Sequence, residues 1–180
     1  KMFGYQKEGV EHVVRHLDGR ALIADDMGLG KTLQAIALSK YYGYKRVLVI
    51  CPAYLRYNWK AEFDKWLGIK EVCLVKTGKD ELNGYPVIIS YELAVKKKLM
   101  LMDYGFDMVI CDESHYLKNH KTKRTRGLSP LIRSISKALL LTGTPALNRP
   151  SELFSQANMI RRDFFPKFKQ FAERYCDRKM

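Results

Sequence analysis

The feature that most constrains this chain is a glycine-containing loop between an apolar run and a helical pattern. The run Arg20–Ala24 leads into D-D-M-G-L-G-K-T at 25–32, and a helical pattern then continues through Tyr42. Glycines let the loop backbone turn its N–H groups inward, where they can surround phosphate oxygens. The N-terminus of the following helix adds partial positive charge at the same place. This order of strand, loop and helix predicts a phosphate-binding site.

Side chains in the loop support this interpretation. Lys31 is placed to reach the β- and γ-phosphates of a nucleotide, and the Thr32 hydroxyl is placed to ligate Mg²⁺. The full pattern G-x-x-x-x-G-K-[ST] has a glycine where Asp25 stands, so this loop is a variant. An ordinary glycine turn before a helix is the alternative interpretation. The flanking strand and helix favour the phosphate loop.

Short apolar runs recur along the chain and indicate strands. Most lack polar alternation, as expected for strands buried on both faces, and they lie at 21–24, 47–51, 72–75, 87–90, 108–111 and 138–142. Helical stripes at Val10–Leu17 and Leu55–Trp66 separate some of them, and Ser129-Pro130 and Pro150-Ser151 are interpreted as helix starts. The alternation predicts an α/β fold, with a doubly wound, mostly parallel sheet and helices on both faces. We expect one domain over residues 1–180.

Two carboxylates end one of the predicted strands. The run 108–111 leads directly into Asp112, Glu113, Ser114 and His115. Such carboxylates are costly to bury unless a cation lies beside them, and Mg²⁺ at a phosphate loop is such a cation. We therefore expect Asp112 to hold Mg²⁺ through water and Glu113 to orient or deprotonate the attacking water. A solvated turn is the alternative, which the upstream phosphate loop disfavours.

Two further segments are candidates for nucleotide contact. The turn Thr142-Gly143-Thr144 is placed to contact Asp112 or His115 and to sense the nucleotide, although a plain turn explains it equally well. Gln6 carries a donor and an acceptor that match an adenine edge, while a surface glutamine is the simpler interpretation. The expected roles are catalysis by Lys31, Asp112 and Glu113, metal binding by Thr32 and Asp112, ATP binding by Gln6, Asp26, Met27, Gly28, Leu29, Gly30, Lys31 and Thr32, and coupling by His115, Thr142, Gly143 and Thr144.

The charge of the chain indicates a polyanionic partner. Its 32 Lys and Arg against 19 Asp and Glu give a formal net charge of +13, and a domain this basic usually meets a polyanion. Between Tyr116 and Lys137 there are seven basic residues and no acid. A solvated face is the alternative. We expect the part of this segment before Pro130 to form a loop, and nucleic-acid contacts from Arg56, Tyr91, Lys118, Lys121, Lys123, Arg124 and Arg126.

Other features limit where the chain acts. No apolar run approaches the ~18 residues of a membrane span, and no signal peptide is present, so we expect no membrane partner. The four cysteines stand far apart, which predicts reduced core thiols in a reducing compartment. The opening Lys1-Met2 suggests a segment of a longer protein. The expected location is the nucleus in a eukaryote and otherwise the cytoplasm.

Taken in order, these segments resemble the motifs of superfamily 2 helicase-like ATPases of the Swi/Snf type. Tyr5-Gln6 resembles the glutamine motif, and 25–32 resembles motif I, although Asp26 stands where Glu is more usual. Motifs Ia, Ib, II and III are matched by V-L-V-I-C-P-A-Y-L-R-Y-N-W at 47–59, V-I-I-S-Y-E at 87–92, D-E-S-H at 112–115 and L-L-T-G-T-P at 140–145. The segments at 146–154, 164–166 and 174–177 are similar to the annealing-helicase branch, the HepA-related fork remodellers.

The resemblance implies a RecA-like lobe, the N-terminal half of a two-lobed motor. Such a motor grips duplex or forked DNA without regard to sequence, steps along it during ATP hydrolysis, and remodels or reanneals it in DNA repair. The second lobe supplies arginines to the ATP, and its pattern Q-x-x-G-R-x-x-R occurs nowhere in this chain. We therefore expect the chain alone to be nearly inactive. An RNA-directed helicase and a nucleotide-binding pseudo-ATPase scaffold remain the alternatives.

Overall fold

The computed structural model describes residues 1–43, 45–145 and 150–176. At its centre lies one six-stranded sheet in the order β1-β6-β5-β2-β4-β3, and every neighbouring pair of strands is parallel. Its strands are β1 (Arg20–Ile23), β2 (Val47–Cys51), β3 (Cys73–Leu74), β4 (Val87–Ser90), β5 (Met108–Asp112) and β6 (Lys137–Leu141). Each of the predicted apolar runs overlaps one of these strands.

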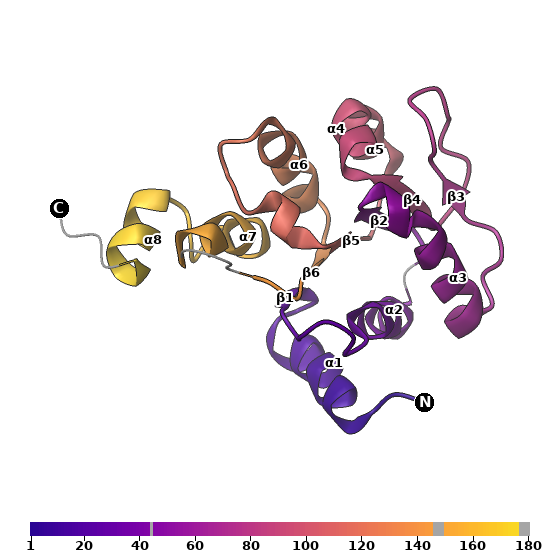
Figure 1. Cartoon of the computed structure of the whole chain (residues 1–180), viewed down its shortest axis with the longest axis horizontal. Helices are drawn as coiled ribbons and strands as arrows, with labels where there is room; N and C mark the ends of the chain where they lie inside the picture. Colours follow the sequence, from indigo (N-terminus) through magenta and orange to yellow (C-terminus); the bar gives the residue numbers. More distant parts are fainter. Residues whose placement is uncertain (44, 146–149, 177–180) are drawn as a thin grey trace.

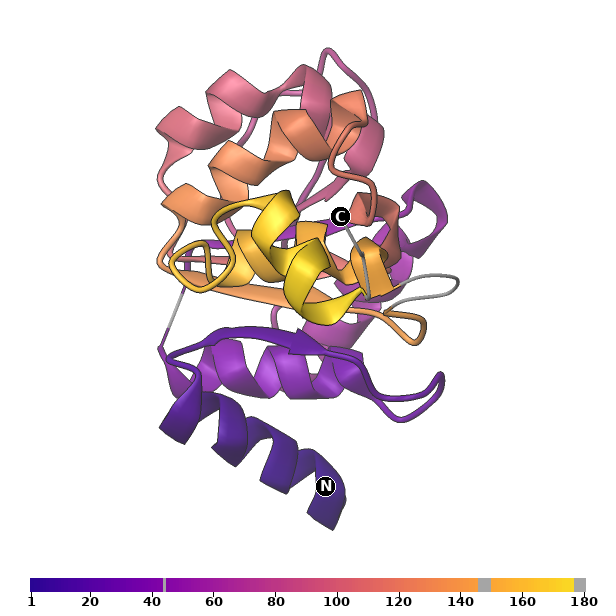
Figure 2. The ribbon, with the colours of Figure 1, turned by 90° about the vertical axis from the view of Figure 1, so that its left-hand side faces the viewer.

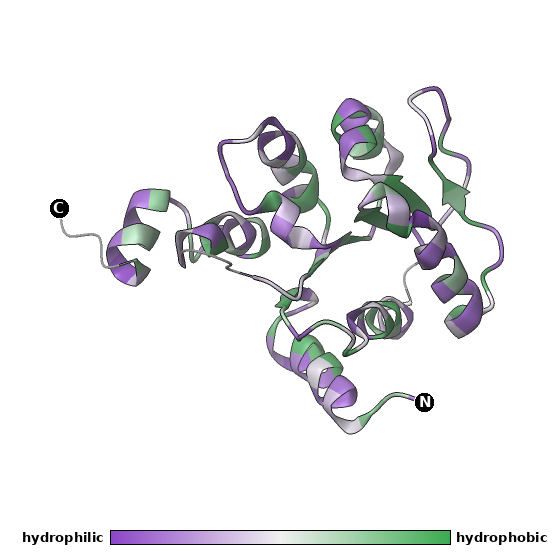
Figure 3. Cartoon of the chain, viewed as in Figure 1, coloured by the Kyte–Doolittle hydropathy of each residue, from purple (hydrophilic) through white to green (hydrophobic). Residues whose placement is uncertain are grey.

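The central strands are apolar on both sides because both faces of the sheet are covered. All residues of β2 and β4 are buried, which accounts for their lack of polar alternation. Figure 3 shows these strands as a continuous hydrophobic band inside the molecule. The sheet separates two hydrophobic clusters, one containing Leu48, Ile50 and Val109 and the other containing Val49 and Ile110.

Helices form a layer on each face of the sheet (Figure 1). One layer consists of α1 (Gly4–His16), α2 (Lys31–Tyr41) and α3 (Arg56–Leu67). The other consists of α4 (Tyr91–Lys96), α5 (Lys98–Tyr104), α6 (Lys123–Ser134) and α7 (Leu153–Ile160). Figures 1 and 2 show α8 (Phe168–Tyr175) beyond α7, at one end of the molecule. The predicted α/β fold with helices on both faces is confirmed.

Parallel pairing brings the loops that follow the strands to one edge. The phosphate loop follows β1, the 3₁₀ turn η1 (Ala53–Leu55) follows β2, and the 3₁₀ turn η2 (Ser114–Leu117) follows β5. The segment after β6 leads to the 3₁₀ turn η3 (Pro150–Glu152) and then to α7. Ligands bind beyond the carboxyl ends of the strands in sheets of this kind. The predicted motifs therefore converge at this carboxyl edge.

One predicted helix start is wrong. The helix assigned to Ser129-Pro130 begins earlier, at Lys123, because the Thr122 hydroxyl caps it by accepting a bond from the Thr125 N–H at 3.2 Å. Pro130 lies inside α6. The basic residues expected in a loop before Pro130 thus divide between a short segment and the first turns of α6. The start assigned to Pro150-Ser151 agrees with η3, which leads into α7.

Three remaining expectations concern the chain as a whole. No helix in the described ranges is both long and apolar enough to cross a membrane. Cys51, Cys73 and Cys111 are buried free thiols, as predicted. Residues 146–149 and 177, which carry part of the resemblance to the annealing-helicase branch, lie outside the described residues.

Candidate nucleotide-binding site

The two loop glycines have different structural tasks. Both have backbone angles that L side chains rarely adopt, with φ of 83° at Gly28 and 77° at Gly30. A Cβ at Gly28 would meet no atom within 4 Å, so the space above this part of the loop is open. A Cβ at Gly30 would collide with the side-chain amide nitrogen of Gln6. Gly28 therefore leaves room for a ligand, and Gly30 allows α1 to approach the loop.

Lys31 lies across the loop, in the first turn of α2. Its ammonium donates to the carbonyl oxygens of Asp25 at 2.8 Å and Asp26 at 2.9 Å. Asp25, which stands where the full pattern has glycine, accepts a bond from the buried Gln34 Nε2 at 2.7 Å. This hydrogen bond connects the loop to α2 at the position where the full pattern has glycine. Sequence reasoning did not identify Gln34, because its polarity becomes informative only once α2 places it beside Asp25.

Gln6 connects α1 to the phosphate loop. Its side chain is 3% exposed, its Oε1 accepts from the Phe3 N–H at 3.0 Å, and its Nε2 donates to the Leu29 carbonyl at 2.9 Å. An amide group has two acceptor lone pairs and two donor hydrogens. One of each remains after these two bonds, which is the combination that an adenine edge requires.

Asp112 ends β5 with its carboxylate held on both sides. Its Oδ2 accepts from the Trp59 indole N–H at 2.8 Å, and its Oδ1 accepts from the Glu113 N–H at 2.9 Å. Burial raises the pKa of the Asp112 carboxyl above its ordinary value, although these two bonds oppose the shift. The orientation of the carboxylate is therefore fixed, and a cation at this place would favour its ionised form.

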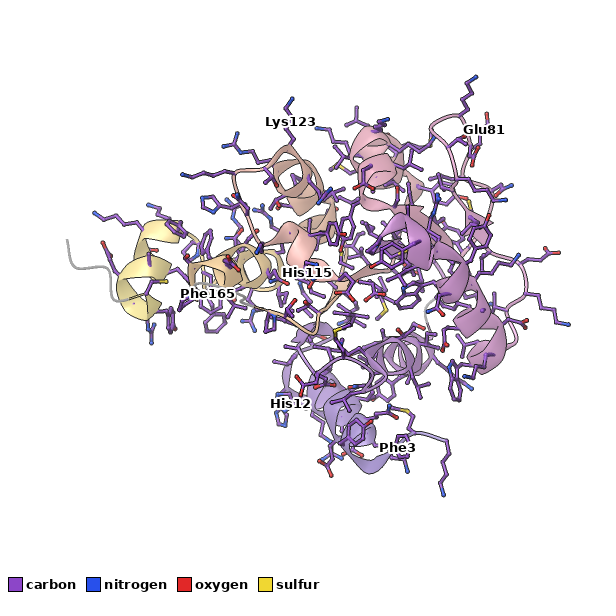
Figure 4. All side chains as sticks on the ribbon, viewed as in Figure 1. Phe3, His12, Glu81, His115, Lys123 and Phe165 are labelled. Atoms are coloured by element: carbon purple, nitrogen blue, oxygen red, sulfur yellow. The ribbon has the colours of Figure 1, made fainter. Side chains whose placement is uncertain are left out.

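The residues after Asp112 connect the strand end to the turn after β6. Glu113 has a φ of 50°, in the left-handed region, and its Oε2 lies 3.1 Å from His115 Nδ1. The same Nδ1 lies 3.5 Å from the Thr142 hydroxyl, which also accepts the Thr144 N–H at 3.1 Å. Figure 4 shows His115 at the centre of the molecule, between the two layers of helices. Gly143 is the fourth predicted coupling residue. It lies close to the phosphate loop, because a Cβ at this position would come within 2.9 Å of Met27 Cγ.

A buried bridge between these turns was not predicted from the sequence. The Ser114 hydroxyl donates to Gln156 Oε1 at 2.6 Å, and Gln156 Nε2 donates to the Pro145 carbonyl at 3.2 Å. Both Ser114 and Gln156 are fully buried. Gln156 belongs to α7, so this helix is bonded to the turn after β5 and to the turn after β6. No local pattern marks Gln156, because its partners come from distant parts of the sequence.

These elements surround a cavity of about 460 Å³ at the carboxyl edge. Its lining residues come from α1, the phosphate loop, α2, α3 and the end of β5: Phe3, Gln6, Met27, Gly28, Gly30, Lys31, Thr32, Leu33, Leu55, Asn58, Glu62, Trp66, Asp112 and Glu113. Lys31 is the only Lys or Arg among these described residues. The space at Gly28 and the Lys31 ammonium suit phosphates. The Thr32 hydroxyl and the Asp112 carboxylate are the hard oxygen ligands that Mg²⁺ prefers.

The side chains predicted to contact nucleic acid differ in how accessible they are. Tyr91 is wrong as a surface contact, because its side chain is fully buried and its hydroxyl donates to the Asp112 carbonyl at 2.8 Å. Arg56 is anchored by bonds to the carbonyls of Ala53 at 3.0 Å and Val75 at 2.6 Å. The side chains of Lys121, Lys123 and Arg126 are exposed, and Figure 4 shows Lys123 pointing away from the start of α6.

Two of the basic side chains already have acidic partners. Arg124 pairs with Glu92 at 2.8 Å, and its guanidinium lies 5.0 Å from the centre of the Tyr116 ring. Lys118 pairs with Glu152 at 3.4 Å. Arg124 and Lys118 are therefore partly committed to contacts within the chain, unlike the exposed lysines beside them.

Comparisons with known proteins agree with this geometry. A family model described as the SNF2-related domain matches residues 5–178. The chain is 41% identical over 180 residues to the SWI/SNF-related matrix-associated actin-dependent regulator of chromatin subfamily A-like protein 1 of Xenopus tropicalis, covering 97% of this chain and 19% of that protein. It is 38% identical over 188 residues to the DNA annealing helicase and endonuclease ZRANB3 of Mus musculus, covering 98% of this chain and 18% of that protein.

A solved structure shows the same architecture. The Sulfolobus solfataricus SWI2/SNF2 ATPase core in complex with dsDNA matches with a TM-score of 0.78 and 26% identity, over 96% of this chain and 38% of that one. The chain thus spans about a fifth of the length of the curated relatives above, which are 19% and 18% covered. The resemblance to the annealing-helicase branch is confirmed by these relatives.

Proposed function

The chain belongs to the SNF2-related domain family, and from that premise we propose that it is the ATP-binding lobe of a DNA-dependent ATPase. The observation that supports this best is the cavity at the carboxyl edge. It brings Lys31, Thr32 and the pair Asp112–Glu113 around one space, although they come from separate elements. The space at Gly28 leaves the loop accessible to phosphates.

Each side chain has a defined task in this proposal. Lys31 exchanges its two carbonyl partners for the β- and γ-phosphates of ATP, which the loop N–H groups also bind. Thr32 and Asp112 hold Mg²⁺, which neutralises charge on the transferred phosphoryl group when it is bound. Glu113 orients the attacking water and accepts its proton. His115 lies between Glu113 and Thr142, so it is placed to link hydrolysis to the turn after β6.

The proposed polymer is DNA, contacted through its phosphates. Lys121, Lys123 and Arg126 are exposed near the start of α6, and phosphate contacts are independent of base sequence, as a translocating motor requires. A second RecA-like lobe completes the site with arginines, and the whole protein acts in the nucleus if its source is a eukaryote and otherwise in the cytoplasm. The relatives named for chromatin, DNA annealing and DNA repair support this assignment.

Nucleotide binding is tested by removing the ammonium of Lys31. We expect Lys31→Ala to lose Mg²⁺-dependent ATP binding in calorimetric titration, because no other Lys or Arg lines the described cavity. Lys40→Ala is the matched control, since Lys40 is an exposed residue near the opposite end of α2. Equal ATP affinities for the wild type and Lys31→Ala would contradict the proposed site.

Hydrolysis is tested by Glu113→Gln in a protein that also carries the second lobe. The substitution keeps the size of the side chain and removes the base, while Asp112 keeps the metal. We expect ATP binding without turnover. Measuring the wild-type rate with duplex DNA and with RNA identifies the polymer. Normal turnover by Glu113→Gln would assign the carboxylate a structural role, and stimulation by RNA alone would replace DNA in the proposal.

A further inference from the structure

A basic groove runs along the seam between α6 and α7, on the face of the sheet opposite α1–α3. Three cavities of about 630, 200 and 470 Å³ follow one another along this seam. The first two share His120 and the last two share Arg133, so they adjoin. We call this depression the α6–α7 groove, and its cationic lining residues include Lys118, Lys121, Arg126, Arg133, Arg161 and Arg162.

Acidic residues balance only part of this charge. The two acids in the lining are Glu152, which pairs with Lys118, and Asp163, which pairs with Arg161. In the described part of the chain, no ion pair is formed by the other five Lys and Arg residues of the lining, which are Arg20, Lys121, Arg126, Arg133 and Arg162. The α6–α7 groove therefore carries uncompensated positive charge.

The pKa values of two groups along the groove are lowered, first by burial and then by neighbouring positive charges. Burial, and then the charge of Arg162, lowers the pKa of Arg133 below its ordinary value. Burial, and then Lys121 and Arg126, lowers the pKa of His120. Like charges are thus held near one another along the groove without enough acid to offset them. An anionic ligand would relieve this repulsion.

Capping of the helix ends does not account for these arginines, because Arg20 performs it. The C-termini of α6 and α7 expose carbonyl groups at one end of the groove. The Arg20 guanidinium donates to the carbonyls of Ile132, Ile135, Ser136, Met159 and Ile160. Burial lowers the pKa of Arg20, as expected for a guanidinium enclosed by the structure. Arg133 donates only its Nε within the protein, to the Ser129 carbonyl at 3.2 Å, so its two terminal nitrogens and the Arg162 guanidinium remain available for a ligand.

Aromatic side chains lie beside the charges. Phe168 lines the first cavity and Phe154 the second, and the His120 ring packs 4.9 Å from Phe168. At the other end, Phe164 is 66% exposed, and the Arg161 guanidinium lies 4.2 Å from the centre of its ring. Phe154 is buried and Phe168 is half-buried, so Phe164 is the exposed ring of these three. An exposed aromatic ring next to a positively charged groove is typical of proteins that bind single-stranded nucleic acid, because a base stacks on the ring.

The dimensions select one strand rather than a duplex. Arg126 and Arg133 are seven residues apart on α6, which is roughly 10 Å along the helix axis, so both can contact phosphates of the same strand. Packed helices have axes only ~8–10 Å apart, so the depression between them is narrow. We propose that the α6–α7 groove binds a single strand of nucleic acid through its phosphates, with Phe164 as a stacking platform. This inference rests on the proposed function, in which the protein acts on DNA.

The test compares salt dependence for matched charge changes. A labelled oligodeoxythymidine of about 12 nucleotides, within the ~4–16-nucleotide sites of single-strand-binding folds, is titrated with the chain by fluorescence anisotropy. The variant is Arg133→Gln/Arg162→Gln, which changes groove arginines that the proposed function does not use, and the control is Lys40→Gln/Lys60→Gln, whose exposed lysines belong to α2 and α3 on the opposite face.

We expect the arginine variant, and not the control, to bind more weakly and to lose about 1.4 from its log–log salt slope, or ~0.7 for each of two contacts. Arg133→Lys/Arg162→Lys keeps the charge and should keep most of the slope. Phe164→Ala should weaken single-strand binding roughly 5- to 150-fold with an unchanged slope. Circular dichroism melting checks that each variant is folded.

Several outcomes would overturn the inference. An unchanged slope in a folded arginine variant, or an equal loss for a blunt duplex, would show that the groove does not hold a single strand. A polyglutamate peptide that displaces the oligonucleotide from the wild type, and binds more tightly at equal ionic strength, would make the groove a docking site for an acidic peptide. An RNA oligonucleotide affected like the DNA would support phosphate binding. Wild-type protein that binds no nucleic acid would instead refute the proposed function.

Discussion

Two hydrogen bonds hold the Asp112 carboxylate in one orientation. Trp59 holds one oxygen and the Glu113 N–H holds the other, at 2.8 and 2.9 Å. Trp59 is itself fully buried in α3 and is therefore immobile. Rigid packing of this kind is what keeps a metal ligand and its neighbouring base in a fixed geometry. Trp59, which lies in α3 after β2, thus contributes to the site by holding the Asp112 carboxylate at the end of β5.

The buried pair Ser114–Gln156 leads to a prediction about stability. Gln156→Leu removes both bonds of the side-chain amide and leaves the Ser114 hydroxyl and the Pro145 carbonyl without it. We expect the free energy of unfolding to fall by about 1–3 kcal/mol, because a buried polar group without a partner is costly. Urea denaturation measures this change.

A double substitution separates the lost bond from the unpaired group. Ser114→Ala combined with Gln156→Leu removes both partners of the shorter bond, so its cost should be smaller than the sum of the two single changes. Simple additivity of the two costs would contradict the assigned interaction between these residues.

Residue chemistry explains which site residues were predictable. Lys31, Thr32, Asp112 and Glu113 follow predicted strands, so the sequence alone indicated that they would meet at one edge, and all four line the same cavity. Tyr91 was assigned as a nucleic-acid contact because it follows a predicted strand, whereas it begins α4 and its hydroxyl donates to a carbonyl inside the protein. Gln156 lies 42 residues from Ser114, and only the fold brings the two together.

The start of α6 shows how two helix signals can compete. Proline favours the first turn of a helix, which is why Pro130 was interpreted as a start. Thr122 carries the stronger signal, because its hydroxyl accepts the Thr125 N–H. The helix therefore includes Pro130 and tolerates the loss of one backbone bond. The strands were easier to predict, since burial on both faces makes them continuously apolar.

The cost of Pro130 inside α6 is measurable. Pro130 is exposed, and its ring nitrogen cannot donate to the carbonyl one turn earlier. We expect Pro130→Ala to raise the free energy of unfolding by about 1–3 kcal/mol, less than the full helix penalty because alanine also loosens the unfolded chain. Thermal and urea denaturation report the change.

A second substitution at the same position provides the control. Pro130→Gly also restores the N–H but adds the flexibility of glycine, so it should stabilise less than Pro130→Ala by about 1 kcal/mol. Lower stability of the alanine variant than of the wild type would show that the proline ring makes a useful contact.

The two helical layers carry different cavities. The layer containing α1, α2 and α3 contributes to the cavity at the carboxyl edge, with Asn58, Glu62 and Trp66 among its lining residues. The layer containing α6 and α7 carries the basic groove. Alternation of strands and helices predicted both layers. The groove was not predictable, because Arg133 and Arg162 come from separate elements that only tertiary packing brings together.

At the scale of the whole molecule, one lysine and no arginine line the described part of the cavity at the carboxyl edge, which leads to a prediction about the rate of ATP hydrolysis. Among the described lining residues only Lys31 is a lysine or arginine, and in related nucleotide hydrolases an added arginine is worth ~10³–10⁵ in rate. We expect the 180-residue chain to hydrolyse ATP far more slowly than ~1 s⁻¹, the low end of ordinary enzyme turnover, with or without duplex DNA. Phosphate release measured beside Glu113→Gln gives the background from contaminating enzymes. A protein that also carries the second lobe should recover DNA-stimulated turnover, because its arginines then reach the phosphates. Rapid, DNA-stimulated hydrolysis by the chain alone would mean that a cation outside the described lining completes the site.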